Sequence, residues 1–141
     1  QANEGCACTM NSILKQFIKH LTVGENEVVL LDMEAGVEHF GRGVDNSVDL
    51  ILMVVDPSFE SLKLTKKIQQ LGESIGKPVF FVLNKVNEQI LPTMLESIDD
   101  QSKVLAVISA DTEIARKGLL GNELMMEIPE IHTLARKILK Q

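Results

Sequence analysis

The chain has 141 residues and a mass of 15.6 kDa, which predicts a single domain over residues 1–141. A net charge of −6 without a lysine-rich run argues against a nucleic-acid surface or a surface for anionic membranes. No apolar stretch approaches the roughly 20 residues that a membrane span requires. The two cysteines do not form a disulfide framework, so we expect a cytoplasmic protein.

The first third of the chain predicts one helix and one strand. Apolar residues recur on one helical face over residues 13–21. His20 lies near the end of this helix, where a cation suits the helix dipole, and is interpreted as structural. A continuous apolar run at 28–31 then predicts a buried strand that Asp32 closes.

The middle of the chain predicts two further strands with a helix between them. An apolar run at 50–55 precedes Asp56 and Pro57, which are typical of a helix N-cap and of the first helical position. An apolar stripe then continues to Gly76, the expected C-cap. The run at 79–83 predicts the third strand.

The last third predicts a helix over residues 88–97, interrupted by Pro92, a strand at 104–108 and an amphipathic helix over 131–139. Strands that alternate with helices predict an α/β layered sandwich with a mainly parallel sheet. Ligands of such folds bind beyond the carboxyl ends of the strands, so the residues that follow each run are candidate site residues.

Three of these segments carry polar side chains. An acidic residue that closes a buried strand is costly without a nearby cation, and in nucleotide hydrolases this position holds Mg²⁺, so Asp32 is a candidate. An ordinary acidic strand end is the alternative. Asn84 begins a segment that lacks the carboxylate of a guanine-specific motif, because Asn87 stands at that place, which argues against GTP. Ser109 and Asp111 follow the last run on the same rim.

The glycine-rich stretch at 36–43 does not form a phosphate loop. Arg42 and Gly43 replace the Lys and Ser/Thr of that motif, and no helix fits before the next strand. We interpret the stretch as a glycine-hinged mobile loop and find no P-loop in the chain.

Cys6 and Cys8 form a C-x-C pair. Two thiolates one residue apart can bind one metal ion but leave a tetrahedral site half filled, and a two-fold dimer would complete it. Soft ligands favour Zn²⁺, Cu(I), an Fe–S cluster or thiophilic Ni²⁺. Two cysteines without a ligand role, or a redox pair, are the alternatives.

Taken together, these motifs cover nearly the whole chain: Gly5-Cys6-Ala7-Cys8, Glu27–Asp32, Glu34–Gly43, Val54-Val55-Asp56-Pro57 and Asn84-Lys85-Val86. They resemble the CooC-type nickel-insertion ATPases, accessory proteins of carbon monoxide dehydrogenase maturation. Those proteins are related to MinD, ParA and the nitrogenase iron protein.

The resemblance implies a homodimer that binds ATP or ADP with Mg²⁺ at its interface, closes when ATP binds, and holds Ni²⁺ or Zn²⁺ at the C-x-C pair. Asp32 would belong to the magnesium site, and Gly36 would lie near the γ-phosphate. Asn84, with Lys85 beside it, and the segment Ser109–Asp111 would border the adenine. Carbon monoxide dehydrogenase or a related nickel enzyme would be the partner.

The chain departs from this family at its start. Members begin with a strand and a G-K-G-G-x-G-K-[TS] loop, which would lie before Gln1, in a chain of roughly 250 residues. We therefore expect a carboxyl-terminal part of a P-loop NTPase fold, inactive alone. We also expect it to repack, or to exchange elements between protomers, where the missing strand leaves a gap.

Three other classes of protein remain as alternatives. A MinD/ParA-type positioning ATPase would use a basic amphipathic last helix. An iron–sulfur reductase would need well-separated cysteines, which the sequence lacks. A non-enzymatic oligomerisation domain would leave the residues at the strand ends without a function.

Overall fold

The computed structural model describes residues 16–18, 20–25, 27–33 and 48–140. Within them, three parallel strands form one sheet in the order β1-β2-β3. The strands are β1 (Ile51–Val55), β2 (Val79–Val86) and β3 (Val104–Ser109). The predicted α/β fold with a parallel sheet is thus confirmed, and it is consistent with a P-loop NTPase-like domain.

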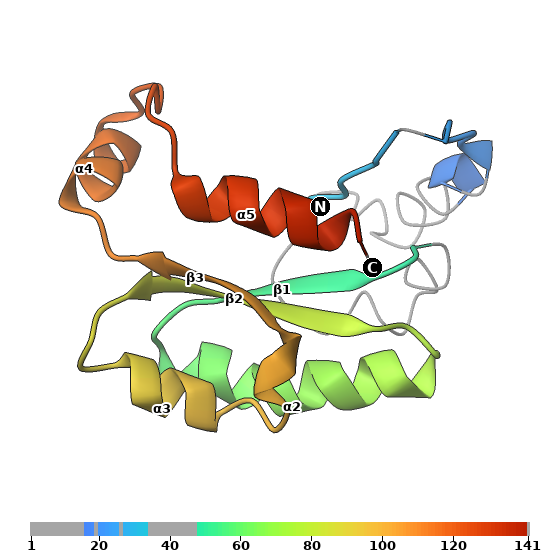
Figure 1. The fold of residues 1–141 in the computed structure, drawn as a ribbon, viewed down its shortest axis with the longest axis horizontal. Coiled ribbons are helices and arrows are strands. Elements are labelled where there is room, and N and C mark those ends of the chain that lie inside the picture. The colour runs from blue at the N-terminus through green and yellow to red at the C-terminus, as the bar shows by residue number, and fades with distance from the viewer. Residues whose placement is uncertain (1–15, 19, 26, 34–47, 141) are drawn as a thin grey trace, which may run out of the picture.

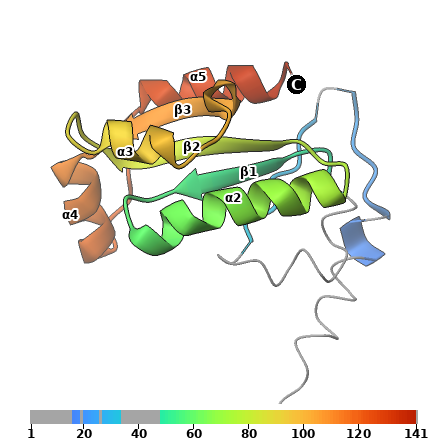
Figure 2. The same cartoon turned by 90° about the horizontal axis from the view of Figure 1, so that it is seen from below.

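Helices flank both faces of the sheet. In Figure 1, α2 (Phe59–Ser74) and α3 (Leu91–Glu96) lie on one face and α5 (Pro129–Ile138) on the other. A 3₁₀ turn, η2 (Gln101–Lys103), leads into β3. Figure 2 shows the strands side by side, with α4 (Thr112–Leu120) beyond their arrowheads. None of the helices in the described ranges is long and apolar enough to cross a bilayer.

The hydrophobic core lies between the sheet and the pair α2 and α3. Val55, Phe81 and Leu83 have no exposed surface, and Met94 of α3 is almost completely buried against them. β1 and β2 pair in regular register from Ile51 with Val79 onward. The apolar runs therefore form strands with one face packed against α2 and α3, while on the other face of β1 the side chain of Val54 stays exposed.

The start of α2 differs from the prediction. Ser58, not Asp56, is the N-cap, and its hydroxyl oxygen accepts a hydrogen bond from the Ser61 N–H at 3.2 Å. The Ser61 hydroxyl in turn accepts one from the Asp56 N–H at 3.1 Å. The carboxylate of Asp56 is thereby left for other partners. The C-cap is Ile75, one position earlier than expected, and Gly76, at a positive φ of 67°, follows it.

The strand predicted at 28–31 is wrong for this structure. The segment has no regular secondary structure, and Leu30 is 82% exposed. A strand requires hydrogen-bond partners along its length, and in the described sheet β1 has only β2 beside it. Asp32 therefore does not close a buried strand. The expected repacking or exchange of elements stays a prediction.

In the last third of the chain, the helices differ from the predictions in one start and in one additional helix. Pro92 lies in the first turn of α3 rather than interrupting it, because a proline there sacrifices no helical hydrogen bond. The unpredicted helix α4 begins after Asp111 and ends before Gly121, which has a positive φ of 64°. The last helix forms as predicted and begins at Pro129.

Candidate functional site

Three polar side chains meet where β1 and β2 end. Asp56 directly follows β1, while Asn84 and Lys85 lie near the end of the neighbouring strand β2. The Asn84 Nδ2 donates to Asp56 Oδ1 at 3.0 Å, and the Lys85 Nζ lies 2.6 Å from Asp56 Oδ2. The carboxylate thus uses both oxygens to hold an amide and an ammonium group. We refer to these three residues as the rim cluster.

A β-bulge brings Lys85 into the rim cluster. Leu83 pairs with Val107 and Val86 with Ser109, so β2 takes three steps where β3 takes two. Lys85 has a φ of 56°, the one positive value among the described non-glycine residues. Bulges redirect side chains in this way and are frequent beside binding sites.

The left-handed backbone at Lys85 costs more free energy than the ion pair of Lys85 with Asp56 contributes. A left-handed backbone at a residue with a Cβ costs about 1–2 kcal/mol. The Lys85 and Asp56 side chains are 63% and 41% exposed, and an ion pair so open to solvent contributes about 0–1 kcal/mol. Backbone strain that its local contacts do not offset is typical of functional sites.

The end of β3 contributes Ser109 and the segment that leads into α4. Ser109 is exposed at the last position of β3, and the next residue, Ala110, donates its N–H to the Val86 carbonyl at 2.8 Å. The Asp111 carboxylate accepts hydrogen bonds from the N–H groups of Glu113 at 2.7 Å and Ile114 at 3.0 Å. Asp111 is therefore the N-cap of α4, which fixes where this helix starts beyond the sheet.

The first turn of α4 carries an exposed ion pair. Glu113 accepts hydrogen bonds from Arg116 Nε at 3.0 Å and Nη2 at 2.8 Å. This contact is the main reason why the pKa of the Glu113 carboxyl lies below its ordinary value, and it raises the pKa of Arg116. Both groups are charged at neutral pH, so the end of the sheet presents mixed charges rather than a basic patch.

The structure brings only part of the predicted site together. Asn84 and Lys85 meet at Asp56, and Ser109 and Asp111 follow at the neighbouring strand end. Asp32 is exposed and has no hydrogen bond or ion pair with any residue that the structure describes. The remaining candidates, Cys6, Cys8 and Gly36, lie outside the described residues.

Sequence reasoning missed the role of Asp56. An Asp-Pro pair after a strand is a common helix start, so the sequence predicts an N-cap at Asp56. In the structure Asp56 instead contacts Asn84, 28 positions away. The available signal was the helix-capping Ser58 two residues later, which leaves Asp56 free to bind elsewhere.

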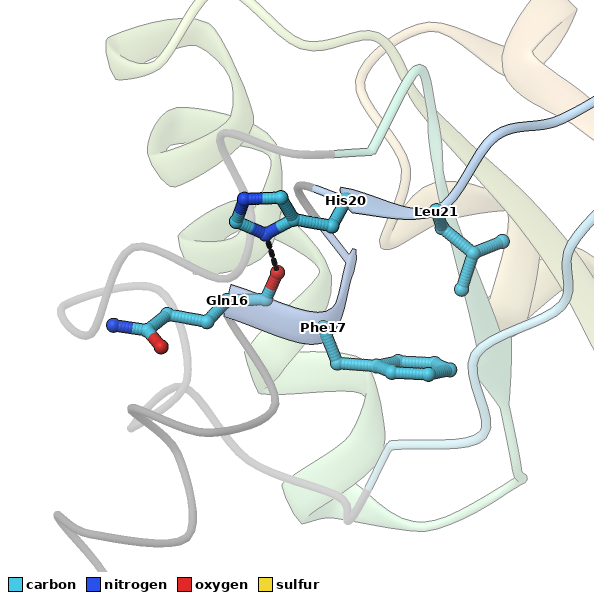
Figure 3. Close-up of a pocket in the computed structure, with 4 residues that line it drawn as sticks. All are labelled: Gln16, Phe17, His20 and Leu21. Carbon is cyan, nitrogen blue, oxygen red and sulfur yellow. Dashed lines mark hydrogen bonds between the residues drawn. The ribbon is translucent and has the colours of Figure 1, made fainter.

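A shallow, mainly apolar pocket of about 550 Å³ lies apart from the rim cluster. Its lining includes Phe17, Leu21 and His20, whose Nδ1 donates to the Gln16 carbonyl at 2.7 Å (Figure 3). This contact lies within one helical turn, and the structural interpretation of His20 stays a prediction. In the described ranges, no group of three or more His, Cys, Asp or Glu side chains fits a metal ion.

Comparison with known proteins finds relatives over nearly the whole chain. The uncharacterized ATP-binding protein MJ0084 of Methanocaldococcus jannaschii is 44% identical over 137 residues, which are 97% of this chain and 55% of the relative. A second protein of that organism, the uncharacterized ATP-binding protein MJ0823, is 33% identical over 90% of the chain and 51% of its own length.

The carbon monoxide dehydrogenase accessory protein CooC of Rhodospirillum rubrum is 33% identical over 114 residues, which are 80% of the chain and 43% of that protein. No model of a known protein family matches. The chain spans about half the length of the curated relatives that it matches. These similarities support a relationship to CooC-like ATP-binding proteins.

Proposed function

We propose that this chain forms part of an ATP-dependent accessory protein that delivers nickel to carbon monoxide dehydrogenase or a related nickel enzyme. The observation that carries the proposal is the rim cluster, which lies at the carboxyl ends of adjacent parallel strands, where α/β folds bind nucleotides. The similarity to proteins described as ATP-binding and to CooC supports the same function.

In this proposal the adenine of ATP or ADP binds at the strand ends. Asn84 and the segment Ser109–Asp111 border the base, with Lys85 beside them. Asp32 and Gly36 serve the Mg²⁺ and γ-phosphate end of the nucleotide.

Nickel is the cargo in this proposal. Cys6 and Cys8 supply two soft thiolate ligands, and a homodimer supplies the second pair, so that one Ni²⁺ or Zn²⁺ is shared between two subunits. ATP binding closes this dimer, and hydrolysis opens it again.

The contacts of α5 bear on the alternative of a membrane-positioning ATPase. A basic amphipathic helix that binds a membrane must be free to do so. Helix α5 packs on β3, and its Lys137 donates to the Leu105 carbonyl, so this helix itself is not free for a membrane.

Anaerobic titration with Ni²⁺ and Zn²⁺, coupled to mass determination in solution, tests the cargo site in the full-length gene product. We expect one metal ion per dimer and loss of binding in Cys6→Ser/Cys8→Ser. Calorimetric titration with MgATP in the same preparation tests the nucleotide site. ATP binding without cysteine-dependent metal binding would contradict the nickel function and favour a positioning ATPase. Absence of both activities would favour an oligomerisation domain.

A further inference from the structure

We propose that Asp56 is a positioning residue that orients the Asn84 amide to select adenine over guanine. This role rests on the proposed function, in which Asn84 borders the base. In the structure, Asn84 Nδ2 donates a hydrogen bond to Asp56 Oδ1. This contact determines which donor and acceptor groups of the Asn84 amide remain for a base.

The chemistry of a carboxylate fixes the orientation of the amide. A carboxylate only accepts hydrogen bonds, so Asn84 must turn its Nδ2 toward Asp56 and cannot present its Oδ1 there. The other carboxylate oxygen is held by the Lys85 ammonium at 2.6 Å, which keeps Asp56 in place. The bulge and the left-handed backbone at Lys85 direct that ammonium toward Asp56.

The oriented amide has one acceptor and one donor left for a ligand. These are the Oδ1 of Asn84 and the second N–H of its Nδ2. The N6 amino group of adenine donates and its N7 accepts, which matches this pair. Guanine presents two acceptors, O6 and N7, along the same edge, so the Asn84 Oδ1 would face an acceptor. Asp56 therefore sets the base preference without touching the base.

The test compares the dissociation constants of MgATP and MgGTP for the full-length gene product by calorimetry. Asp56→Asn keeps the size of the side chain but lets its amide donate to Asn84 Oδ1, so the Asn84 amide is free to turn over. We expect the ratio of the GTP constant to the ATP constant to fall about tenfold, mainly because ATP binds more weakly. Asp56→Ala, which removes the acceptor altogether, should lower the ratio similarly.

The chain offers a matched control in Asp99→Asn. Asp99 also pairs with a lysine, Lys66 at 3.3 Å, and both side chains are 61% exposed. The pair lies outside the rim cluster, so we expect the ratio to stay at the wild-type value. Thermal melting of every variant confirms that the partly exposed Asp56 can be replaced without unfolding.

A double-mutant cycle tests whether Asp56 acts through Asn84. In an Asn84→Ala background, Asp56→Asn should leave the ratio unchanged, because the amide that it orients is gone. An unchanged ratio in both single Asp56 variants, or a change that persists in the Asn84→Ala background, would overturn the positioning role. Wild-type protein that binds both nucleotides equally would overturn it and leave the proposed function standing. Wild-type protein that binds neither would overturn both.

Discussion

At the scale of single residues, close packing decides which glycines accept a side chain. A Cβ added at Gly72 of α2 would lie 2.2 Å from Val79 Cγ2 and 3.0 Å from the Lys77 carbonyl oxygen. A Cβ added at Gly118 of α4 would meet no atom within 4 Å. The absence of a side chain at Gly72 therefore lets α2 approach the start of β2 closely. No such contact requires a glycine at position 118.

This difference gives a prediction with its own control. We expect Gly72→Ala to lower the free energy of unfolding by about 1–3 kcal/mol, because the new methyl group overpacks the contact with Val79. Gly118→Ala should raise it by about 0.5–1 kcal/mol, because alanine loses less backbone entropy in a helix. Urea unfolding of the two variants measures both changes. Equal effects of the same sign would contradict the packing explanation.

Sequence patterns predicted the strands, which depend on local apolar runs. They did not predict the rim cluster, which depends on contacts between residues far apart in the sequence. The runs at 50–55, 79–83 and 104–108 became strands, as their continuous apolar character predicted, although Val54 in the first of them stays exposed. The run at 28–31 has the same character but no neighbouring strand in the described sheet. The rim cluster depends on an extra residue in the register between β2 and β3, which no pattern in β2 alone reveals.

At the scale of elements, α4 depends on its two ends because it has little core of its own. None of its residues is buried, and Leu119 and Leu120 near its end are exposed. Asp111 and Gly121 cap the helix and were visible in the sequence, but without an apolar stripe they were not recognised as helix ends. The cap also sets where the segment after β3 turns at the proposed base site.

The N-cap of α4 is open to a direct test. Asp111→Ala removes the acceptor of two N–H groups and should lower the free energy of unfolding by about 1 kcal/mol. Asp111→Asn keeps an oxygen at the same place and should change it by only a few tenths of a kcal/mol, since Asn and Asp rank together as N-caps. Chemical denaturation with helix content followed by circular dichroism measures both. An Asn variant as unstable as the Ala variant would show that the charge, and not the cap, is what matters.

At the scale of the whole molecule, the main feature of the sheet that the structure describes is that β1 has a neighbouring strand on one side only. In the described sheet β1 is an end strand, and its Val54 is 56% exposed. In the segment 28–31, Val28, Val29 and Leu30 are also exposed. An end strand with apolar side chains offers unpaired backbone groups to other chains, which is why proteins usually cover or charge such edges. The 141-residue chain should therefore associate with itself through this side.

Adjacent residues of β1 allow a controlled test of that association. Val54→Lys places a charge on the exposed side of the strand, so we expect light scattering to show less self-association as the protein concentration rises, with an unchanged melting temperature. Val55→Lys places the same charge at a fully buried position and should unfold the domain, because a buried ammonium has no partner there. If the Val54 variant associates as strongly as the unmodified chain, another surface is responsible. The exposed apolar residues in the last turn of α4 and after it, among them Leu119 and Met125, would then be the next to change.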